Sequence, residues 1–463
     1  MLDNGTESRY NNPNEIRGFF MDENLIYNKP ITAANMLAFA IPTTVRMVFI
    51  SLYTTVDGIV VSNYVGSMGL SAINIVYPVL NVNMALAFMF AMGSNALIGK
   101  MLGEEKRTEA NRFMTLTVLL NVALVMVIMT LFFTWDESIY MMLGSDEALL
   151  PYCVEYGTIM VAVGPIWTLQ ILFQGYLVTA DKPGMGLWLS VLGGVLNVIL
   201  DVVLVGVLDM GLTGAGLASG AGMFVGGILP LFVFFNKKSL LHFEKPARPG
   251  MDVLRALGNG TSEMVSSLSS AVTTAMFNLQ MMSLAGEKGV AAISALFYLQ
   301  FLFVTVFIGF TSGISPVVSY NYGAGNRENI RKLFNIAVRV IAIDSAVMFL
   351  LAELLDRPMT MIFASNDPVL AELMISGFKI LALSILLCGV NIFASGYFTA
   401  LNNGRVSALI SFLRTFAFEV GTLILLPAFM GIDGVWWTLP CAELLSAVVS
   451  VSLLIKYRKV YGY

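Results

Sequence analysis

The chain has 463 residues, of which 57% are hydrophobic and only 12% are charged, and its formal net charge is −4. A soluble protein of this length needs a more highly charged surface, so the composition predicts that most of the chain lies in lipid. We find no stripe of Lys and Arg interleaved with aromatic residues, which argues against nucleic acid as a partner. The three cysteines lie far apart and there is a single histidine, so neither a disulfide framework nor a His/Cys metal cluster is expected.

Twelve apolar segments are long enough to cross a bilayer, since a helix of about 20 residues spans the hydrocarbon. They are Ala33 to Val61, Leu70 to Leu97, Phe113 to Trp135, Tyr152 to Thr179, Leu187 to Leu208, Gly214 to Phe235, Val253 to Leu284, Val290 to Tyr320, Ile330 to Leu354, Val369 to Leu401, Val406 to Met430 and Gly434 to Ile455. The polar stretch ahead of them has no apolar core typical of a cleaved signal peptide. The predicted fold class is therefore an all-α membrane protein of twelve transmembrane helices.

Positive charges are distributed unevenly between the loops, and Lys and Arg near helix ends favour the cytoplasmic side. They cluster after the second, sixth and eighth predicted helices and in the tail, at residues 100–112, 237–255, 327–332 and 456–459. The loops on the opposite side are acidic and carry only Lys288 and Arg357 as cations. This asymmetry predicts a multi-pass membrane protein with both termini in the cytoplasm.

The sequence matches itself at an offset of about 220 residues, which is typical of a duplicated architecture. Gly93 aligns with Gly313, and Gly103 aligns with Gly323. Each repeat holds six predicted helices, an even number, so the two halves should be related by a pseudo-two-fold axis along the membrane normal. We expect a cytoplasmic N-terminal segment at 1–32, an N-lobe at 33–235, a cytoplasmic linker at 236–251, a C-lobe at 252–456 and a cytoplasmic tail at 457–463.

Three polar residues inside predicted helices of the N-lobe have no counterpart in the second repeat. Asp57, Asn197 and Asp201 align with Phe277, Phe418 and Thr422. An ionisable group within a membrane costs about 2.5–3.5 kcal/mol on insertion scales, which favours a functional role. Two buried carboxylates repel, so one would hold a proton, or a cation such as Na+ would lie between them. The alternative is that each acid only bonds to a neighbouring helix.

Two segments resemble motifs of the multidrug and toxic compound extrusion (MATE) family. They are LGGVLNVILDVVLVGVLDMGLTGAGLAS, from Leu192 to Ser219, and QGYLVTADKP, from Gln174 to Pro183. The resemblance covers about Ala33 to Lys456 and is closest to the prokaryotic branch with its acids in the first lobe. It therefore implies that the protein lies in a prokaryotic cytoplasmic (inner) membrane.

This resemblance implies a coupling-ion site and a hinge. The ligands of H+ or Na+ would be Asp57, Asn197, Asp201, Gln174 and Ser219, of which the last two replace the Asn and Thr often found in the family. Pro42, fifteen residues before Asp57, resembles a proline at which helix 1 bends, and its alternative reading is an ordinary transmembrane proline. Other members use a glutamate in helix 7, but Glu263 lies at a different depth and lacks the preceding proline.

A substrate cleft between the lobes is expected to be lined by flexible thioethers and aromatic rings, which suit bulky organic cations. The candidates are Met89, Met92, Phe277, Met281, Phe297 and Phe301. The alternative is that these side chains face lipid or pack within a lobe. Further charged residues fall in predicted helices, and Arg414 and Glu419 are five positions apart, a poor spacing for pairing along one helix face.

The sequence contains no Walker motif and no Ser/His/Asp set, so we expect neither an enzyme nor a cofactor. The predicted function is secondary active efflux of small organic cations by a monomer, in exchange for H+ or Na+, through alternating access of the two lobes. A flippase for a lipid-linked precursor would need cleft cations for pyrophosphate, whereas the candidates here are acidic or apolar. A metabolite exporter is a further alternative, and a receptor without transport would have no use for buried acids.

Overall fold

The structure, a computed structural model, describes residues 25–364 and 367–463, without the side chains of 55–63, 66, 67, 70, 362 and 363. These ranges fold into helices and contain no strand. The first half comprises α2 (Ala33–Gly103), α3 (Arg107–Met142), α4 (Leu150–Thr179), α5 (Pro183–Leu200), the π-helix η1 (Asp201–Val207), α6 (Gly211–Ile228) and α7 (Pro230–Phe234). The second half comprises α8 (Met251–Gly323), α9 (Arg327–Leu354), α10 (Asp356–Ala364), α11 (Pro368–Ala400), α12 (Gly404–Phe412), the π-helix η2 (Leu413–Phe418), α13 (Glu419–Met430) and α14 (Ile432–Tyr461).

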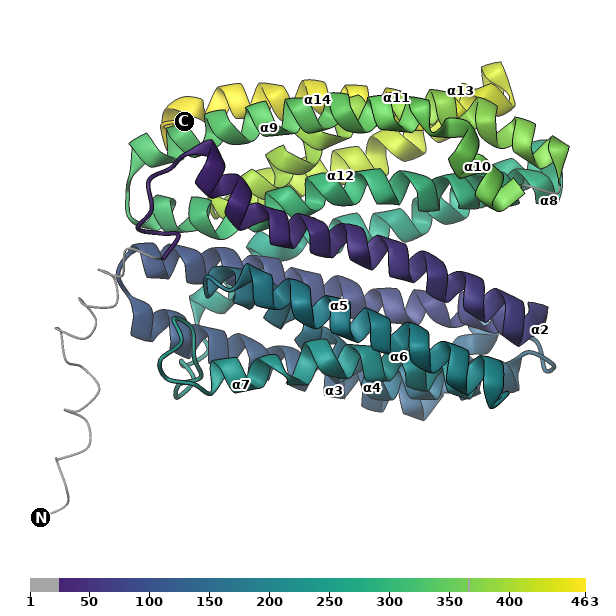
Figure 1. Cartoon of the computed structure of the whole chain (residues 1–463), viewed down its shortest axis with the longest axis horizontal. Coiled ribbons are helices and arrows are strands. Elements are labelled where there is room, and N and C mark those ends of the chain that lie inside the picture. The colour runs from purple at the N-terminus through teal and green to yellow at the C-terminus, as the bar shows by residue number, and fades with distance from the viewer. Residues whose placement is uncertain (1–24, 365–366) are drawn as a thin grey trace, which may run out of the picture.

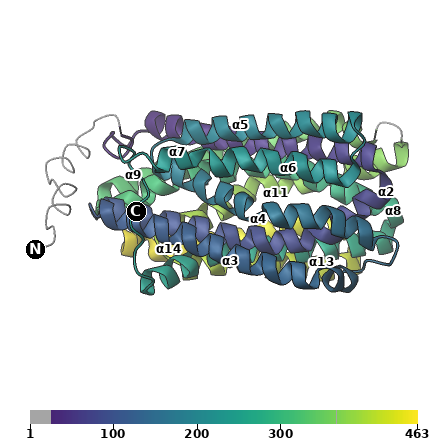
Figure 2. The ribbon, with the colours of Figure 1, turned by 90° about the horizontal axis from the view of Figure 1, so that it is seen from below.

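The two halves of the chain form two layers of helices that run along a common long axis (Figure 1). The helices from α3 to α7 lie in one layer and those from α9 to α14 in the other, and α2 contacts α8 between them. Figure 2 shows the same helices from below, again extended along that axis. This arrangement is the predicted pair of lobes.

The long helix α8 makes two crossings, because its chain folds back on itself. Gly286 breaks the helical geometry with φ 64° and ψ −153°, a conformation that favours glycine. Near the two ends of α8, Asn259 and Ser319 donate hydrogen bonds of 2.8 and 2.9 Å to the adjacent carbonyls of Thr399 and Ala400. The described ranges hold eleven candidate membrane spans, and the 73 residues of α8 are enough for two, which gives the twelve predicted crossings.

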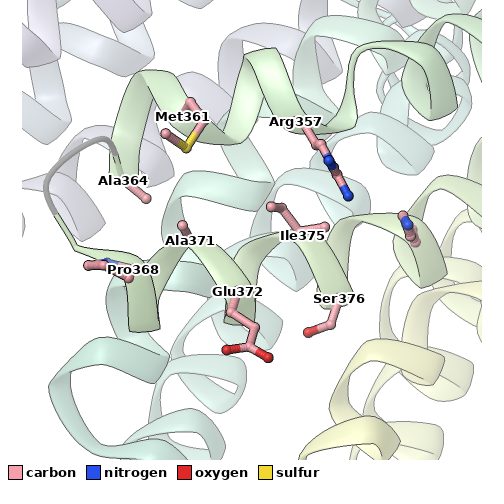
Figure 3. Close-up of a pocket in the computed structure, with 9 residues that line it drawn as sticks. Arg357, Met361, Ala364, Pro368, Ala371, Glu372, Ile375 and Ser376 are labelled. Atoms are coloured by element: carbon pink, nitrogen blue, oxygen red, sulfur yellow. The ribbon is translucent and has the colours of Figure 1, made fainter.

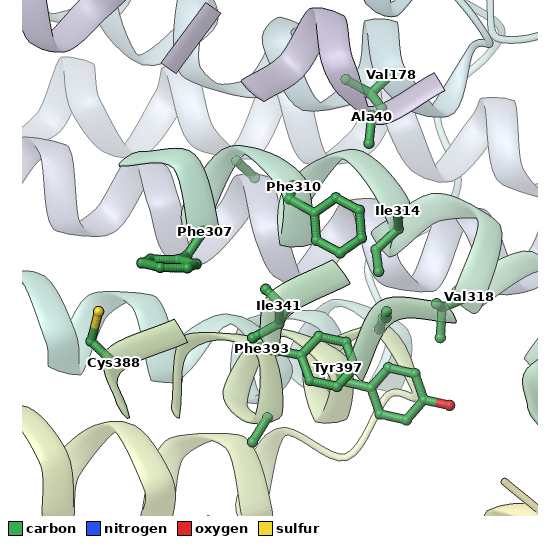
Figure 4. Packing of buried hydrophobic residues seen from close by; sticks show 14 of the residues in the cluster. Ala40, Val178, Phe307, Phe310, Ile314, Val318, Ile341, Cys388, Phe393 and Tyr397 are labelled. Carbon is green, nitrogen blue, oxygen red and sulfur yellow. The ribbon is translucent and has the colours of Figure 1, made fainter. Parts of the chain in front are cut away.

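The buried apolar core extends across both lobes (Figure 4). Ala40 and Val178 come from the N-lobe, and Phe310 and Ile314 come from the C-lobe; each is less than one-tenth exposed. Tyr397 also joins this cluster, from α11. Apolar side chains gain little free energy when they move from lipid into a protein core, because lipid is equally apolar. Van der Waals contact between closely packed side chains is therefore the main apolar attraction between the lobes.

Glycines allow the backbones of α2 and α8 to touch. A Cβ on Gly93 would collide with the carbonyl oxygen of Ala256, and a Cβ on Gly260 would collide with that of Met89. Such close approach without side chains is a common basis of helix association in membranes. In the second repeat, Gly313 aligns with Gly93 and makes the matching contact, since a Cβ on Gly313 would lie 2.9 Å from Cα of Ala40.

The same two helices also touch where Gly99 meets Ser319, its partner in the internal repeat, and where neighbouring residues of the two repeats meet. Gly103 lies against the backbone of Tyr320 and Gly323 lies against that of Lys100, while a Cβ on Gly99 would lie 2.8 Å from Cβ of Ser319. Partners at an offset of about 220 residues can meet only near the axis that relates the repeats. The cytoplasmic ends predicted for α2 and α8 therefore cross at the pseudo-two-fold axis.

The segment ahead of α2 joins the two lobes at this same end of the molecule. The Tyr27 hydroxyl donates to the Thr179 carbonyl at 2.7 Å, and its ring stacks on Tyr320 with centroids 4.5 Å apart. Nearby, Asn402 donates from Nδ2 to the Ala96 carbonyl at 3.2 Å. The lobes are thus in close contact at the end that carries residues 25–32, the linker and the C-terminus (Figure 1).

Candidate ion-coupling site

Asn197 and Asp201 form a buried polar pair at the junction of α5 and η1. The Asn197 side chain donates from Nδ2 to Oδ2 of Asp201 at 3.0 Å, and the two residues are 4% and 0% exposed. Asp201 begins the π-helical segment, a rare geometry that is frequent at functional sites because it changes the direction of side chains and frees backbone groups. The predicted pairing of these two residues on one helix face is present.

Small residues bring α6 against this pair. A Cβ on Gly193 would lie 2.7 Å from the Gly222 carbonyl oxygen, and a Cβ on Gly222 would lie 3.1 Å from Cβ of Asn197. Ser219, which is half-buried, precedes Gly222 by three residues and therefore shares its face of α6. Because α5 and α6 are consecutive antiparallel helices, this position places Ser219 near the depth of Asp201.

The first leg of α2 packs on the same part of α5. A Cβ on Gly194 would lie 2.7 Å from Cε1 of Phe49 and 3.0 Å from Cδ1 of Tyr53. Asp57 follows Tyr53 by four residues in the same helix, but its side chain lies outside the described residues. A site shared by Asp57 and Asp201 stays a prediction.

Gln174 lies farther from the pair than the predicted ligand set requires. Its Nε2 donates to Oγ of Ser190 at 3.2 Å, which joins α4 to α5. Ser190 precedes Asp201 by eleven residues, about 16 Å along a helix axis. In this conformation Gln174 therefore holds the two helices together at another depth, and its role as an ion ligand stays a prediction.

Pro42 lies inside α2 next to the contact between the lobes. Its neighbours Thr43 and Thr44 lie against Gly309 of α8, since a Cβ on that glycine would lie 3.2 Å from the Thr43 carbonyl oxygen. Proline lacks the amide hydrogen of a helix bond, which is a recognised cause of bending. A bend there would change how α2 meets α8.

The expected cleft residues have different environments in this conformation. Phe277 and Met281 are 1% and 0% exposed, and the Phe277 ring meets the Phe297 ring edge to face at 5.1 Å. Phe301 is 41% exposed, and the side chains of Met89 and Met92 are half-buried. Contact of these side chains with a substrate stays a prediction.

The C-lobe contains an ion pair that the sequence did not predict. Arg414 donates from Nη2 and Nε to Oε1 of Glu443 at 2.6 and 2.9 Å. Asn391 donates from Nδ2 to Oε2 of the same carboxylate at 2.6 Å. These residues come from η2, α14 and α11, so helix periodicity could not relate them. The available signal was only that apolar segments of one lobe carried opposite charges.

Among the described residues, no group of three or more His, Cys, Asp or Glu residues could hold a metal ion. The Na+ predicted at Asp57, Asn197 and Asp201 depends on a side chain outside that search. Carboxylate and amide oxygens are suitable ligands of hard cations, and the Asn197–Asp201 pair provides both.

Comparison with known proteins gives consistent relatives over almost the whole chain. The family model MatE matches residues 42–203 and again residues 262–422, so the second match begins one repeat after the first. The multidrug export protein MepA of Staphylococcus saprophyticus is 23% identical over 446 residues, which cover 94% of this chain and 97% of the relative. MepA of Staphylococcus aureus strain N315 is 22% identical with the same coverage.

Two solved structures have the same fold. One is described as the outward-facing conformation of a multidrug resistance MATE family transporter of the MOP superfamily; it has a TM-score of 0.88, is 21% identical and covers 94% of this chain and 97% of its own. The other is a MATE crystal structure in complex with MaL6, with a TM-score of 0.89, 21% identity and coverage of 94% and 98%. At this identity the structures establish the two-lobe helical fold.

Proposed function

Since the chain belongs to the MatE family of multi-pass membrane transporters, we propose that it exports small organic cations in exchange for H+ or Na+. The observation that carries this proposal is the Asn197–Asp201 pair, which lies buried in a candidate membrane span. The second repeat has Phe418 and Thr422 at these positions, so the duplicated fold itself does not require the pair. A buried acid of one lobe is suited to ion coupling.

Exchange follows if the ion and the drug favour different arrangements of the lobes, because a ligand shifts an equilibrium only by its differential affinity for the two states. The proposed orientation places the termini and the linker in the cytoplasm. The contacts of Gly93, Gly103 and Tyr27 then close the cytoplasmic side. In the proposed orientation, this conformation is therefore the outward-facing one. Binding of the ion near Asp201 would alter the packing of α2 on α5, and Pro42 provides a bend in α2.

The direct test is efflux of ethidium from proteoliposomes under separately imposed pH and Na+ gradients. We expect transport that depends on at least one gradient, and its loss in Asp201→Asn. Asp344→Asn is the matched control, since it removes a carboxylate from a candidate span of the C-lobe and should transport normally. Ethidium movement that is independent of both gradients, or equal loss in the two variants, would contradict the proposal.

A second candidate, movement of a lipid-linked precursor with an anionic headgroup, is favoured by one observation. Arg46 is only 6% exposed, and within the described part of the chain its Nε and Nη1 have no hydrogen-bond partner. A buried guanidinium without an acidic partner is costly and could be satisfied by an anionic ligand. Flipping of a fluorescent lipid diphosphate that is abolished in Arg46→Gln would support this candidate over drug efflux.

A further inference from the structure

Tyr77 of α2 and Tyr298 of α8 belong to different lobes, yet their phenol groups lie close enough to interact electrostatically. Their side chains are 53% and 46% exposed. Tyr77 lies 26 positions before the end of α2 at Gly103, and Tyr298 lies 25 positions before the end of α8 at Gly323, about 38 Å along a helix axis in each case. Because these two helix ends touch, the tyrosines lie at matching heights at the far ends of their crossings.

The close contacts between α2 and α8 lie toward the linker end of the molecule. In the described part of the chain, each glycine that packs one of these helices against the other is within 14 positions of the linker end of its crossing. These glycines are Gly93, Gly99, Gly103, Gly260, Gly309, Gly313 and Gly323. The two tyrosines lie beyond this region, so their exposed rings border the opening between the lobes. In the proposed orientation, this opening faces outward.

The face of α2 that carries Tyr77 is suited to water or to a cation. Asn74, about one turn earlier, is exposed, whereas Val76 and Leu80 are 0% and 4% exposed and pack within the N-lobe. Pro78 lies inside the helix and has no amide hydrogen, so the carbonyl oxygen of Asn74 cannot receive the usual helix bond from that position. A carbonyl oxygen and an amide side chain thus add negative partial charge beside the Tyr77 ring.

A second opening at this end of the molecule is not suited to a cation. It is a groove of about 660 Å³ between α10 and α11 of the C-lobe. Arg357 extends from α10 toward α11 (Figure 3), and Lys379 is also among the lining residues. Lys379 lies 3.8 Å from Asp356, but Arg357 has no acidic partner within 4.0 Å in the described part of the protein. The guanidinium would repel an organic cation there.

We propose that Tyr77 and Tyr298 hold an organic cation between their rings at the mouth of the cleft. The face of an aromatic ring is negative, and sites built from several rings recognise quaternary and delocalised cations. A belt of tyrosines at the lipid headgroups is the alternative arrangement, but it would not bring together two tyrosines from opposite lobes. This site rests on the proposed export of organic cations, and it assigns the residues that recognise the positive charge.

The test measures the Kd of tetraphenylphosphonium for the purified full chain by isothermal titration calorimetry, at one pH and one Na+ concentration. Triphenylphosphine oxide, a neutral molecule with three of the same phenyl groups, reports apolar contact without the charge. The variants replace Tyr77 or Tyr298 by phenylalanine or by alanine. The matched control is Tyr64→Ala: Tyr64 is a 55% exposed tyrosine of α2, but it packs within the N-lobe, 3.3 Å from a Cβ placed on Gly206.

We expect each alanine variant to bind tetraphenylphosphonium about 5-fold more weakly, as for the loss of one cation–π contact, and to lose less affinity for triphenylphosphine oxide. The phenylalanine variants keep the ring face and should bind within about two-fold of the unmutated protein. Tyr64→Ala should bind like the unmutated protein. Equal losses for the two probes, equal losses in the phenylalanine and alanine variants, or the same loss in Tyr64→Ala would overturn the proposal.

This binding experiment applies no gradient, so its outcome is separate from that of coupled efflux. Binding that depends on the two rings, without efflux driven by H+ or Na+, would support the site and overturn the proposed exchange. Efflux driven by a gradient, with unchanged binding of tetraphenylphosphonium in both alanine variants, would overturn the site alone.

Discussion

Gly93 of α2 and Gly260 of α8 lie backbone to backbone, so that a methyl group on either residue would meet the opposite main chain. We predict that Gly260→Ala destabilises this closed arrangement by about 1–3 kcal/mol through overpacking and slows efflux. Gly258, two residues before Gly260 in α8, has no neighbour within 4 Å of an added Cβ. Gly258→Ala should therefore be neutral or slightly stabilising, since alanine is the better helix former. Equal efflux and equal thermal stability of the two variants would show that the close contact is unimportant.

We predict that the buried pair of Arg414 and Glu443 can be broken only at high cost. In Arg414→Leu, the carboxylate of Glu443 loses its cation although Glu443 is only 4% exposed. This substitution should lower stability by about 3–5 kcal/mol. Replacing both residues by leucine should recover much of that loss, because no uncompensated charge remains. Thermal unfolding of the two single variants and the double variant measures the coupling; additive losses would mean that the pair contributes nothing as a pair.

We predict that Tyr27 helps to hold the two lobes together at the linker end. Tyr27→Phe removes only the hydrogen bond to Thr179, whereas Tyr27→Ala also removes the stacking on Tyr320. Aromatic contacts contribute about 0.5–1.5 kcal/mol beyond burial, so the alanine variant should open the contact several-fold more often. Labelling of a cysteine placed at Ser319 by a water-soluble thiol reagent reports this opening.

Labelling in that experiment should increase from the unmutated protein to Tyr27→Phe and then to Tyr27→Ala. The control is Tyr152→Ala, which removes a tyrosine that is 42% exposed at the other end of the molecule. If all variants were labelled at the same rate, Tyr27 would have no part in closing the lobes.

The linker should lose stability in mild acid because of His242. Burial is the main cause that lowers the pKa of His242 from its usual value of 6.5, and its Nδ1 lies 3.2 Å from Asn111 Nδ2. Folding therefore disfavours the protonated form, so stability is highest above about pH 6.5 and falls as the pH drops through that value. His242→Gln should reduce this dependence in thermal unfolding; an unchanged profile would exclude His242 as its source.

The sequence was sufficient to predict the helical lobes and their internal relationship. The apolar spans and the offset of about 220 residues predicted two six-helix halves, and the contact of Gly103 with the end of α8 follows from the same offset. The four-residue spacing predicted that Asn197 and Asp201 share a face, and they are hydrogen-bonded. Both kinds of feature depend on local periodicity or on repetition, which a single sequence contains.

Other features depend on how distant helices are rotated against one another, which periodicity does not determine. The partner of Arg414 is Glu443, 29 positions away, and not Glu419 in its own helix segment. Gln174 bonds to Ser190 rather than lying beside Asp201, because the packing of α4 on α5 sets which turn it meets. Where the short helix α10 lies, the sequence predicts only a loop, since nine residues are too few to cross a membrane.

In the proposed mechanism, the buried acid of the N-lobe links ion binding to drug binding. The most direct measurement is the apparent Kd of ethidium for the purified protein at acidic and alkaline pH, and with and without Na+ at constant ionic strength. We predict a several-fold change under at least one of these conditions, and a flat response in Asp201→Asn and in Asp57→Asn, because each ligand shifts the same equilibrium. Identical binding curves of the unmutated protein under all conditions would contradict it, and would leave Asn197 and Asp201 with a structural role alone.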